Sequence, residues 1–219
     1  MLVTTYAAVG RLNQKERTRA AIVEGARDLI RAGAEVTMSS VAGAARVSEA
    51  TAYRYFPDVV SLLREAVIDL WPSAQKALQP VADSRDVVER VAFATDFLLR
   101  EVLHYQGAVR SIISASITRP QNAAARPGRR FGLIDHALAP LADTLARTEA
   151  PALARALAQL RRDLAVVMSA EALFTLTDLC ELAPDDAITS AVTTARTLTQ
   201  AVVEAADEEY RGPAPHPRR

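Results

Sequence analysis

The chain has 219 residues, of which 50% are hydrophobic, 5% aromatic and 24% charged, and this is the composition of a folded globular protein. Its 26 basic and 26 acidic residues balance, so the chain as a whole is not a general binder of polyanions. No charge-free run is long enough for a membrane-spanning helix, and the start carries no secretory signal. We therefore expect a cytoplasmic protein that does not associate with membranes.

The first predicted element is a long helix that begins near Asn13. The Asn13 side chain and Glu16, three residues later, have the spacing of a capping box. The apolar residues that follow recur at helical spacing and predict one buried stripe: Ile22, Ala26, Leu29 and Ile30. Gly33 is expected to end this helix.

Two short helices and a fourth, longer helix are predicted next. The first short helix spans about 39–45, and the second spans about 49–55 with Ser48 as its N-cap. Pro57 ends the second one, and Asp58 is expected to cap a helix that continues to about Ala77.

The remaining predicted elements are longer helices separated by Pro and Gly. A helix begins at Ser84 and breaks at Gly107. A short helix follows at 109–118, and a longer one at 131–147 is expected to be kinked or split by Pro140. Pro151 opens a helix to about Leu182, and Pro184 opens the last one. Residues 121–130 are a predicted loop and 211–219 a disordered tail. No strand pattern is present, so the fold class is all-α.

The segment between Val41 and Phe56 has the outline of a helix-turn-helix: two short helices, a tight turn with Val47 buried, and a longer helix before them. Its second helix is too short to be stable alone and too polar to be core, which suits an element presented to a partner. Between Arg11 and Tyr55 stand eight basic and five acidic residues. This local excess fits a DNA-binding module, although a solvated helix face has the same charge pattern.

The stretch from Arg17 to Leu63 resembles the tetracycline-repressor (TetR) family. The most specific part is Thr51-Ala52-Tyr53-Arg54-Tyr55-Phe56-Pro57 followed by Leu62, and Gly33, Val36-Thr37, Val41-Ala42 and Val47-Ser48 add to it. Two positions depart from the family pattern. Arg46 stands where many members have Gly, and Val59-Val60 stands where many have Lys-Glu, which removes one phosphate contact.

The resemblance implies a DNA-binding head over residues 11–57, a helical ligand-binding and dimerisation body over 58–207, and a disordered tail over 208–219. It also implies a homodimer in which the segments 151–182 and 184–206 of two subunits pack together. The function that it implies is a ligand-responsive transcriptional regulator: a repressor that binds a palindromic double-stranded DNA operator and is released by a small-molecule effector.

The candidate DNA contacts lie on the helix-turn-helix and the preceding helix. Hydroxyl and guanidinium groups can donate to phosphates, and Arg54 can also pair with guanine. Glu49 either accepts a hydrogen bond from cytosine or favours the positive N-terminus of its helix. For Tyr53 and Tyr55 the alternative is packing against the first helix. The full candidate set is Arg17, Ser39, Ser48, Glu49, Ala50, Thr51, Tyr53, Arg54 and Tyr55.

The candidate ligand contacts combine aromatic and polar side chains in the central segments, the composition of an enclosed site. They are Phe93, Phe97, Arg100, His104, Arg110, Ser114, Phe131 and His136.

Catalytic, cofactor and metal sites are not predicted. The chain has no nucleophile elbow, Walker loop, dinucleotide-binding glycine motif or zinc-protease motif, and its three histidines stand far apart. Cys180, the single cysteine, is expected to be a small buried hydrophobe. A second interpretation of the chain is an all-α small-molecule-binding or scaffold protein whose N-terminal helices contact protein rather than DNA. An enzyme is the third.

Overall fold

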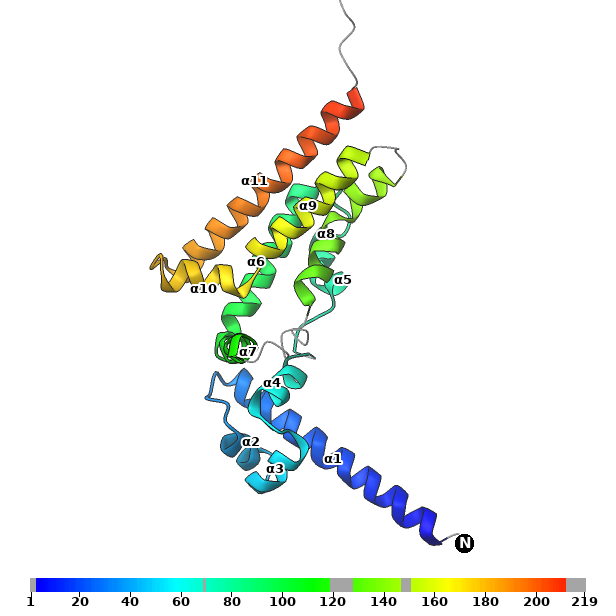
Figure 1. The fold of residues 1–219 in the computed structure, drawn as a ribbon, viewed down its shortest axis with the longest axis vertical. Helices are drawn as coiled ribbons and strands as arrows, with labels where there is room; N and C mark the ends of the chain where they lie inside the picture. Colours follow the sequence, from blue (N-terminus) through cyan, green and yellow to red (C-terminus); the bar gives the residue numbers. More distant parts are fainter. Residues whose placement is uncertain (1–2, 69, 119–127, 147–150, 212–219) are drawn as a thin grey trace, which may run out of the picture. The chain divides into compact units, whose positions relative to one another are not determined.

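The computed structural model describes residues 3–68, 70–118, 128–146 and 151–211, and every regular element in these ranges is a helix (Figure 1). The prediction of an all-α fold is confirmed. Among the described residues, no helix is both long enough and apolar enough to pass through a membrane.

The chain divides into two compact units. The first contains the residues up to Trp71 together with the segment that begins at Tyr105, and the second contains Pro72–His104 and the residues from Gly128 onward. The helices of the first unit are α1 (Val3–Arg31), α2 (Met38–Ala44), α3 (Glu49–Tyr55), α4 (Val59–Ile68) and α7 (Gln106–Thr118). Those of the second are α5 (Ala74–Ala77), the 3₁₀ helix η1 (Gln79–Val81), α6 (Val87–His104), α8 (Arg129–Leu145), α9 (Pro151–Val167), α10 (Ala170–Asp178) and α11 (Pro184–Arg211).

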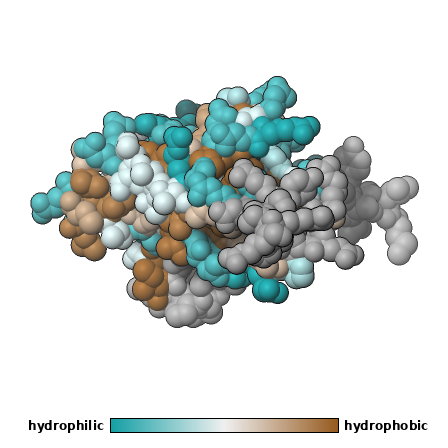
Figure 2. All heavy atoms as spheres, turned by 90° about the horizontal axis from the view of Figure 1, so that it is seen from above, coloured by the Kyte–Doolittle hydropathy of each residue, from teal (hydrophilic) through white to brown (hydrophobic). Residues whose placement is uncertain are grey.

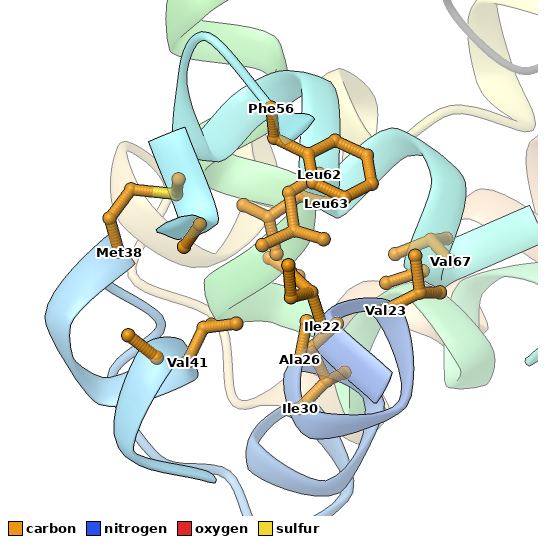
Figure 3. Close-up of a cluster of buried hydrophobic side chains, with 14 of the residues drawn as sticks. Ile22, Val23, Ala26, Ile30, Met38, Val41, Phe56, Leu62, Leu63 and Val67 are labelled. Atoms are coloured by element: carbon orange, nitrogen blue, oxygen red, sulfur yellow. The ribbon is translucent and has the colours of Figure 1, made fainter. Parts of the chain in front are cut away.

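The core of the first unit forms where α1, α2 and α4 meet. Figure 3 shows that α1 supplies Ile22, Val23, Ala26 and Ile30, that α2 supplies Met38 and Val41, and that Leu62, Leu63 and Val67 come from α4. Ala108 and Ile112 of α7 are buried in the same cluster. Because α4 and α7 complete this core, the packing of the first unit extends past Pro57, where the sequence placed the end of the head.

In the second unit α6 lies at the centre. It packs against α8 and α11, and α9 packs against α8 and α11 (Figure 1). Ile188 and Ala195 of α11 are fully buried inside this unit, whereas Val192, Leu198 and Val202 on the same helix are half-buried.

Arg90 of α6 is buried, with 4% of its surface exposed, and its guanidinium donates only to backbone carbonyls. One of them is the carbonyl of His136, at 2.8 Å from Nη2. That carbonyl would normally accept from the residue four positions later, which is Pro140, and Pro140 has no N–H. Arg90 therefore replaces the hydrogen bond that Pro140 removes, and α8 passes through Pro140 without splitting.

Several of the predicted helix starts and ends are wrong. The helix predicted to begin at Ser84 begins at Val87 and ends at His104, and Gly107, the predicted break, lies inside α7. The first helix does not begin at Asn13 but at Val3, so Asn13 lies inside α1 and does not cap it. The fourth helix ends at Ile68 rather than near Ala77. Pro72 cannot continue a helix, and Ser73 starts the separate α5 by accepting from the N–H of Lys76.

The single helix predicted from Pro151 to Leu182 is two helices. The chain leaves α9 after Val167, and Ser169, in an extended conformation, caps α10 by accepting from the N–H of Ala172 at 3.0 Å. At the other end, α11 continues to Arg211, so the start of the predicted tail is helical. The rest of that tail, 212–219, and most of the predicted loop, 121–127, lie outside the described residues.

The turn between α10 and α11 exposes apolar side chains and the cysteine. Leu179 is 78% exposed, and Cys180 is exposed as well, so the prediction that Cys180 is buried is wrong. In Figure 2, hydrophobic residues reach the surface at the left end of the view, where Figure 1 draws this turn. The reason is local: α10 ends at Asp178 and the next residues form a turn instead of a helix face.

Candidate nucleic-acid interface

The turn between α2 and α3 closes α2 with a Schellman motif. The N–H of Val47 donates to the carbonyl of Ala42 at 2.9 Å, and the N–H of Arg46 donates to the carbonyl of Gly43 at 3.1 Å. The same motif ends α1, where Gly33 has a φ of 65°. In the motif that ends α2, Arg46 itself takes the left-handed conformation, with a φ of 54°. The departure from glycine at this position therefore leaves the turn unchanged and places an exposed cation in it.

We expect Arg46→Gly to stabilise the protein slightly. The left-handed conformation costs a residue with a side chain about 1 kcal/mol, and the greater freedom of glycine in the unfolded chain offsets part of that gain. The net change should be about 0.5 kcal/mol, measured by urea denaturation. Ala45→Gly is the matched control: Ala45 has a right-handed conformation, so glycine there should destabilise. If Arg46→Gly destabilises as well, the strain at this turn is absent.

Helix α3 divides into an inner and an outer face. Ala52 is fully buried, Phe56 after the helix is buried too, and Tyr55 packs against the same cluster. Tyr53 and Arg54 lie on the other side, with Tyr53 48% exposed. Of the two tyrosines, Tyr53 is thus the more available for a contact, while Tyr55 is held half-buried by packing.

The N-terminus of α3 is fixed by its own hydroxyl groups. Ser48 Oγ accepts from the N–H of Thr51 at 3.2 Å and lies 2.8 Å from Thr51 Oγ1. Glu49 occupies the first turn of α3, where its carboxylate faces the positive end of the helix. These contacts hold the short helix in place before any partner arrives.

Three arginines of α1 form ion pairs within the protein. Arg19 forms an ion pair with Glu65, and Arg27 and Arg31 both contact Glu24. The hydrogen bond from Arg31, and next that from Arg27, hold the pKa of Glu24 below its ordinary value. These three cations have protein partners already.

By contrast, the cations near the turn and on the N-terminal part of α1 form no ion pair with any other described residue. They are Lys15, Arg17, Arg46 and Arg54, all of them exposed. The Arg54 guanidinium lies 5.5 Å from the centre of the Tyr55 ring. Arg46 was not among the sequence-based candidates, and the signal that could have included it is its position in a turn that requires a left-handed residue.

The other predicted contacts are also placed. Ser39 on α2 and Ala50 on α3 are exposed. Val59, at one of the positions where many TetR members have Lys-Glu, packs against the core cluster, and Asp58 caps α4 by accepting from the N–H of Ser61 at 2.7 Å.

The predicted ligand residues do not form one group. Arg110 and Ser114 are on α7 of the first unit, and the other six are on α6 and α8 of the second. Arg100 contacts Asp96 and Asp185 on the surface, and Phe131 lies under the Arg161 guanidinium. Phe93 and Phe97 are half-buried and His104 is exposed, whereas His136 lines a polar pocket that also contains Arg90.

No model of a known protein family matches this chain, and neither a curated protein nor a solved structure shows significant similarity to it.

Proposed function

We propose that the protein is a ligand-responsive transcriptional regulator that binds double-stranded DNA in the cytoplasm. It acts as a repressor of the kind that the resemblance to the TetR family implies, and α3 enters the major groove of an operator half-site. A small molecule bound to the second unit releases it from the operator.

The observation that carries this proposal is the outer face of α3 with the turn before it. Tyr53 and Arg54 on α3 and Arg46 in the preceding turn are exposed, and neither arginine has an acidic partner among the described residues. An α-helix fits the major groove, and guanidinium and hydroxyl groups are the donors that phosphates and guanine accept from. A helix of seven residues that uses one face for packing has only this other face for a partner.

The regulator is proposed to be a homodimer, so that two copies of α3 meet the two halves of a palindromic operator. Val192 and Leu198 of α11 are half-buried in their own unit, so a dimer contact can use them together with apolar side chains that the unit leaves exposed. Val166 of α9, 70% exposed, and Leu179, 78% exposed, lie in the segment to which the sequence assigned dimerisation.

Arg54→Ala tests this function. An operator is first selected from a random pool of duplexes with the wild-type protein. On that operator, Arg54→Ala should lose about 1–3 kcal/mol of binding free energy, and the preference at one base pair should relax if Arg54 reads guanine. Wild-type affinity should also fall steeply as salt rises, because neutralised phosphates release counterions.

Arg31→Ala is the matched control for Arg54→Ala. It removes an arginine of the same unit that already contacts Glu24 and Asp28, so operator affinity should not change. An equal loss for Arg54→Ala on operator and random DNA would reduce Arg54 to a phosphate contact. A protein that selects no duplex and binds none at low salt would exclude the regulator and leave the interpretation as a protein-binding module.

A further inference from the structure

The second unit contains a polar pocket of about 580 Å³ between α5, η1, α6 and α8. This volume is in the range of small-molecule sites. Charged side chains line it on three sides: Lys76 from α5, Arg90 from α6 and Asp143 from α8. Ser73 and Gln79 add uncharged hydrogen-bonding groups.

The buried charge of Arg90 has no acidic partner in the part of the chain that the structure describes. Its Nε donates to Ala137, its Nη1 to Val81, Ala82 and Ser84, and its Nη2 to His136, all of them backbone carbonyls. Every nitrogen of the guanidinium donates at least once in these bonds, but its positive charge stays uncompensated. A buried charge is usually paired, so the region around Arg90 keeps a positive potential.

One N–H of Arg90 is also left over. A guanidinium has two N–H groups on Nη2, and one of them donates to His136. The second has no acceptor among the described residues. Arg90 lines the pocket and is 96% buried, so its positive charge acts on a ligand in the pocket from within the protein.

The charges that line the pocket favour an anion with a single negative charge. Lys76 is exposed and forms no ion pair with a described residue, whereas Asp143 is an opposing negative charge. The two cations, Lys76 and Arg90, and the one carboxylate, Asp143, give a net charge of about +1. This charge complements a single negative charge and not a doubly charged phosphate.

We infer that this pocket binds a small organic monocarboxylate, with the carboxylate between Lys76 and Arg90. The inference rests on the proposed function only in naming this molecule as the class of effector. Binding to the pocket itself does not depend on DNA.

The test uses benzoate and benzamide as probes, titrated into the full chain by calorimetry. The two have nearly the same shape and differ in charge. Benzoate should bind saturably and at least about tenfold more tightly than benzamide, because a charged acceptor interacts more strongly with a cation. Inorganic phosphate should bind more weakly than benzoate.

Two surface variants should then change benzoate affinity in opposite directions. Lys76→Gln removes an attraction and should weaken binding about fivefold, and Asp143→Asn removes a repulsion and should strengthen it about threefold. Lys15→Gln is the matched control, since it removes a lysine of the first unit and should leave benzoate affinity unchanged.

Any of three results would overturn the inference: no saturable benzoate binding, equal affinity for benzoate and benzamide, or a Lys76→Gln variant that binds as the wild type does. Phosphate binding as tight as that of benzoate would make the pocket a general anion site and would equally contradict it. DNA binding is measured separately. If the protein binds benzoate as expected but selects no operator, the inference about the pocket is supported and the proposed regulator function is rejected. If it selects an operator but does not bind benzoate, the regulator function is supported and the inference about the pocket is rejected.

Discussion

Arg90→Met should lower the free energy of unfolding by about 3 kcal/mol or more. Methionine fills a similar volume but donates nothing, so the carbonyl of His136, which Pro140 cannot reach with an N–H, loses its donor, and four further carbonyls lose a bond to the guanidinium. Each buried polar group without a partner costs about 1–3 kcal/mol. Two of these carbonyls belong to α8, at His136 and Ala137, and the others lie between η1 and α6. The loss is measured by urea denaturation followed by circular dichroism.

Pro140→Ala is the partner variant that identifies the reason for this loss. Alanine at 140 restores an N–H that can donate to His136 within α8. In that background Arg90→Met should cost less, by about 1 kcal/mol, because one of the carbonyls has regained a helical donor.

Arg85→Met is the control for loss of an arginine at a nearby exposed site, and it should change stability by less than about 0.5 kcal/mol. If the loss of stability in the double variant equals the sum of the losses in Arg90→Met and Pro140→Ala within about 0.5 kcal/mol, Arg90 does not compensate for the proline.

The elements that sequence reasoning predicted well are those whose signals are local. The expected bounds of the second short helix, 49–55, agree with α3, because Ser48 caps it and Pro57 follows its end. Gly33 likewise closes α1 through its left-handed backbone. Such caps and stops depend on a few neighbouring residues and are visible without knowledge of the fold.

The features that sequence reasoning missed depend on distant contacts or on two local signals in competition. Asn13 and Glu16 have capping spacing, yet nothing before them stops a helix, so α1 continues through them. Ser169 interrupts an apolar pattern that by itself predicts one helix. The partners of Arg90 are 46 and 47 positions away on α8, and no periodicity indicates that an arginine is needed beside Pro140.

The same limit applies to the candidate site. The charge count of the first unit predicted an excess of basic residues but could not tell which of them have partners. Arg19 pairs with Glu65, 46 residues away, whereas Arg54 has no acidic partner within the described ranges. For Arg19 the distinction depends on the packing of α1 against α4, whereas Arg27 and Arg31 have acidic partners within α1 itself. This distinction narrows the candidate cations to those near the turn and on the N-terminal part of α1.

Gly25→Leu is expected to damage the first unit strongly. Gly25 lies in the middle of α1, where glycine is normally unfavourable by about 1 kcal/mol relative to alanine. It is tolerated because α2 approaches closely: a Cβ at this position would lie 3.1 Å from the backbone N of Ala45 and 3.2 Å from the Cβ of Ala44. A leucine has no space there and must push the end of α2 away from α1.

This displacement should cost about 1–3 kcal/mol of stability, and it should also weaken operator binding, because α2 and the turn after it hold α3. Gly43→Leu is the matched control. Gly43 is also helical, but a Cβ added to it meets nothing within 4 Å, so the better helix former should stabilise the protein by up to about 1 kcal/mol.

Urea denaturation and operator titration of the two variants give both readouts, and benzoate binding in the second unit should be unchanged. If Gly25→Leu is as stable as Gly43→Leu, the close contact between α1 and α2 does not exist. If Gly25→Leu loses stability but binds the operator with wild-type affinity while folded, the position of α3 does not depend on that contact.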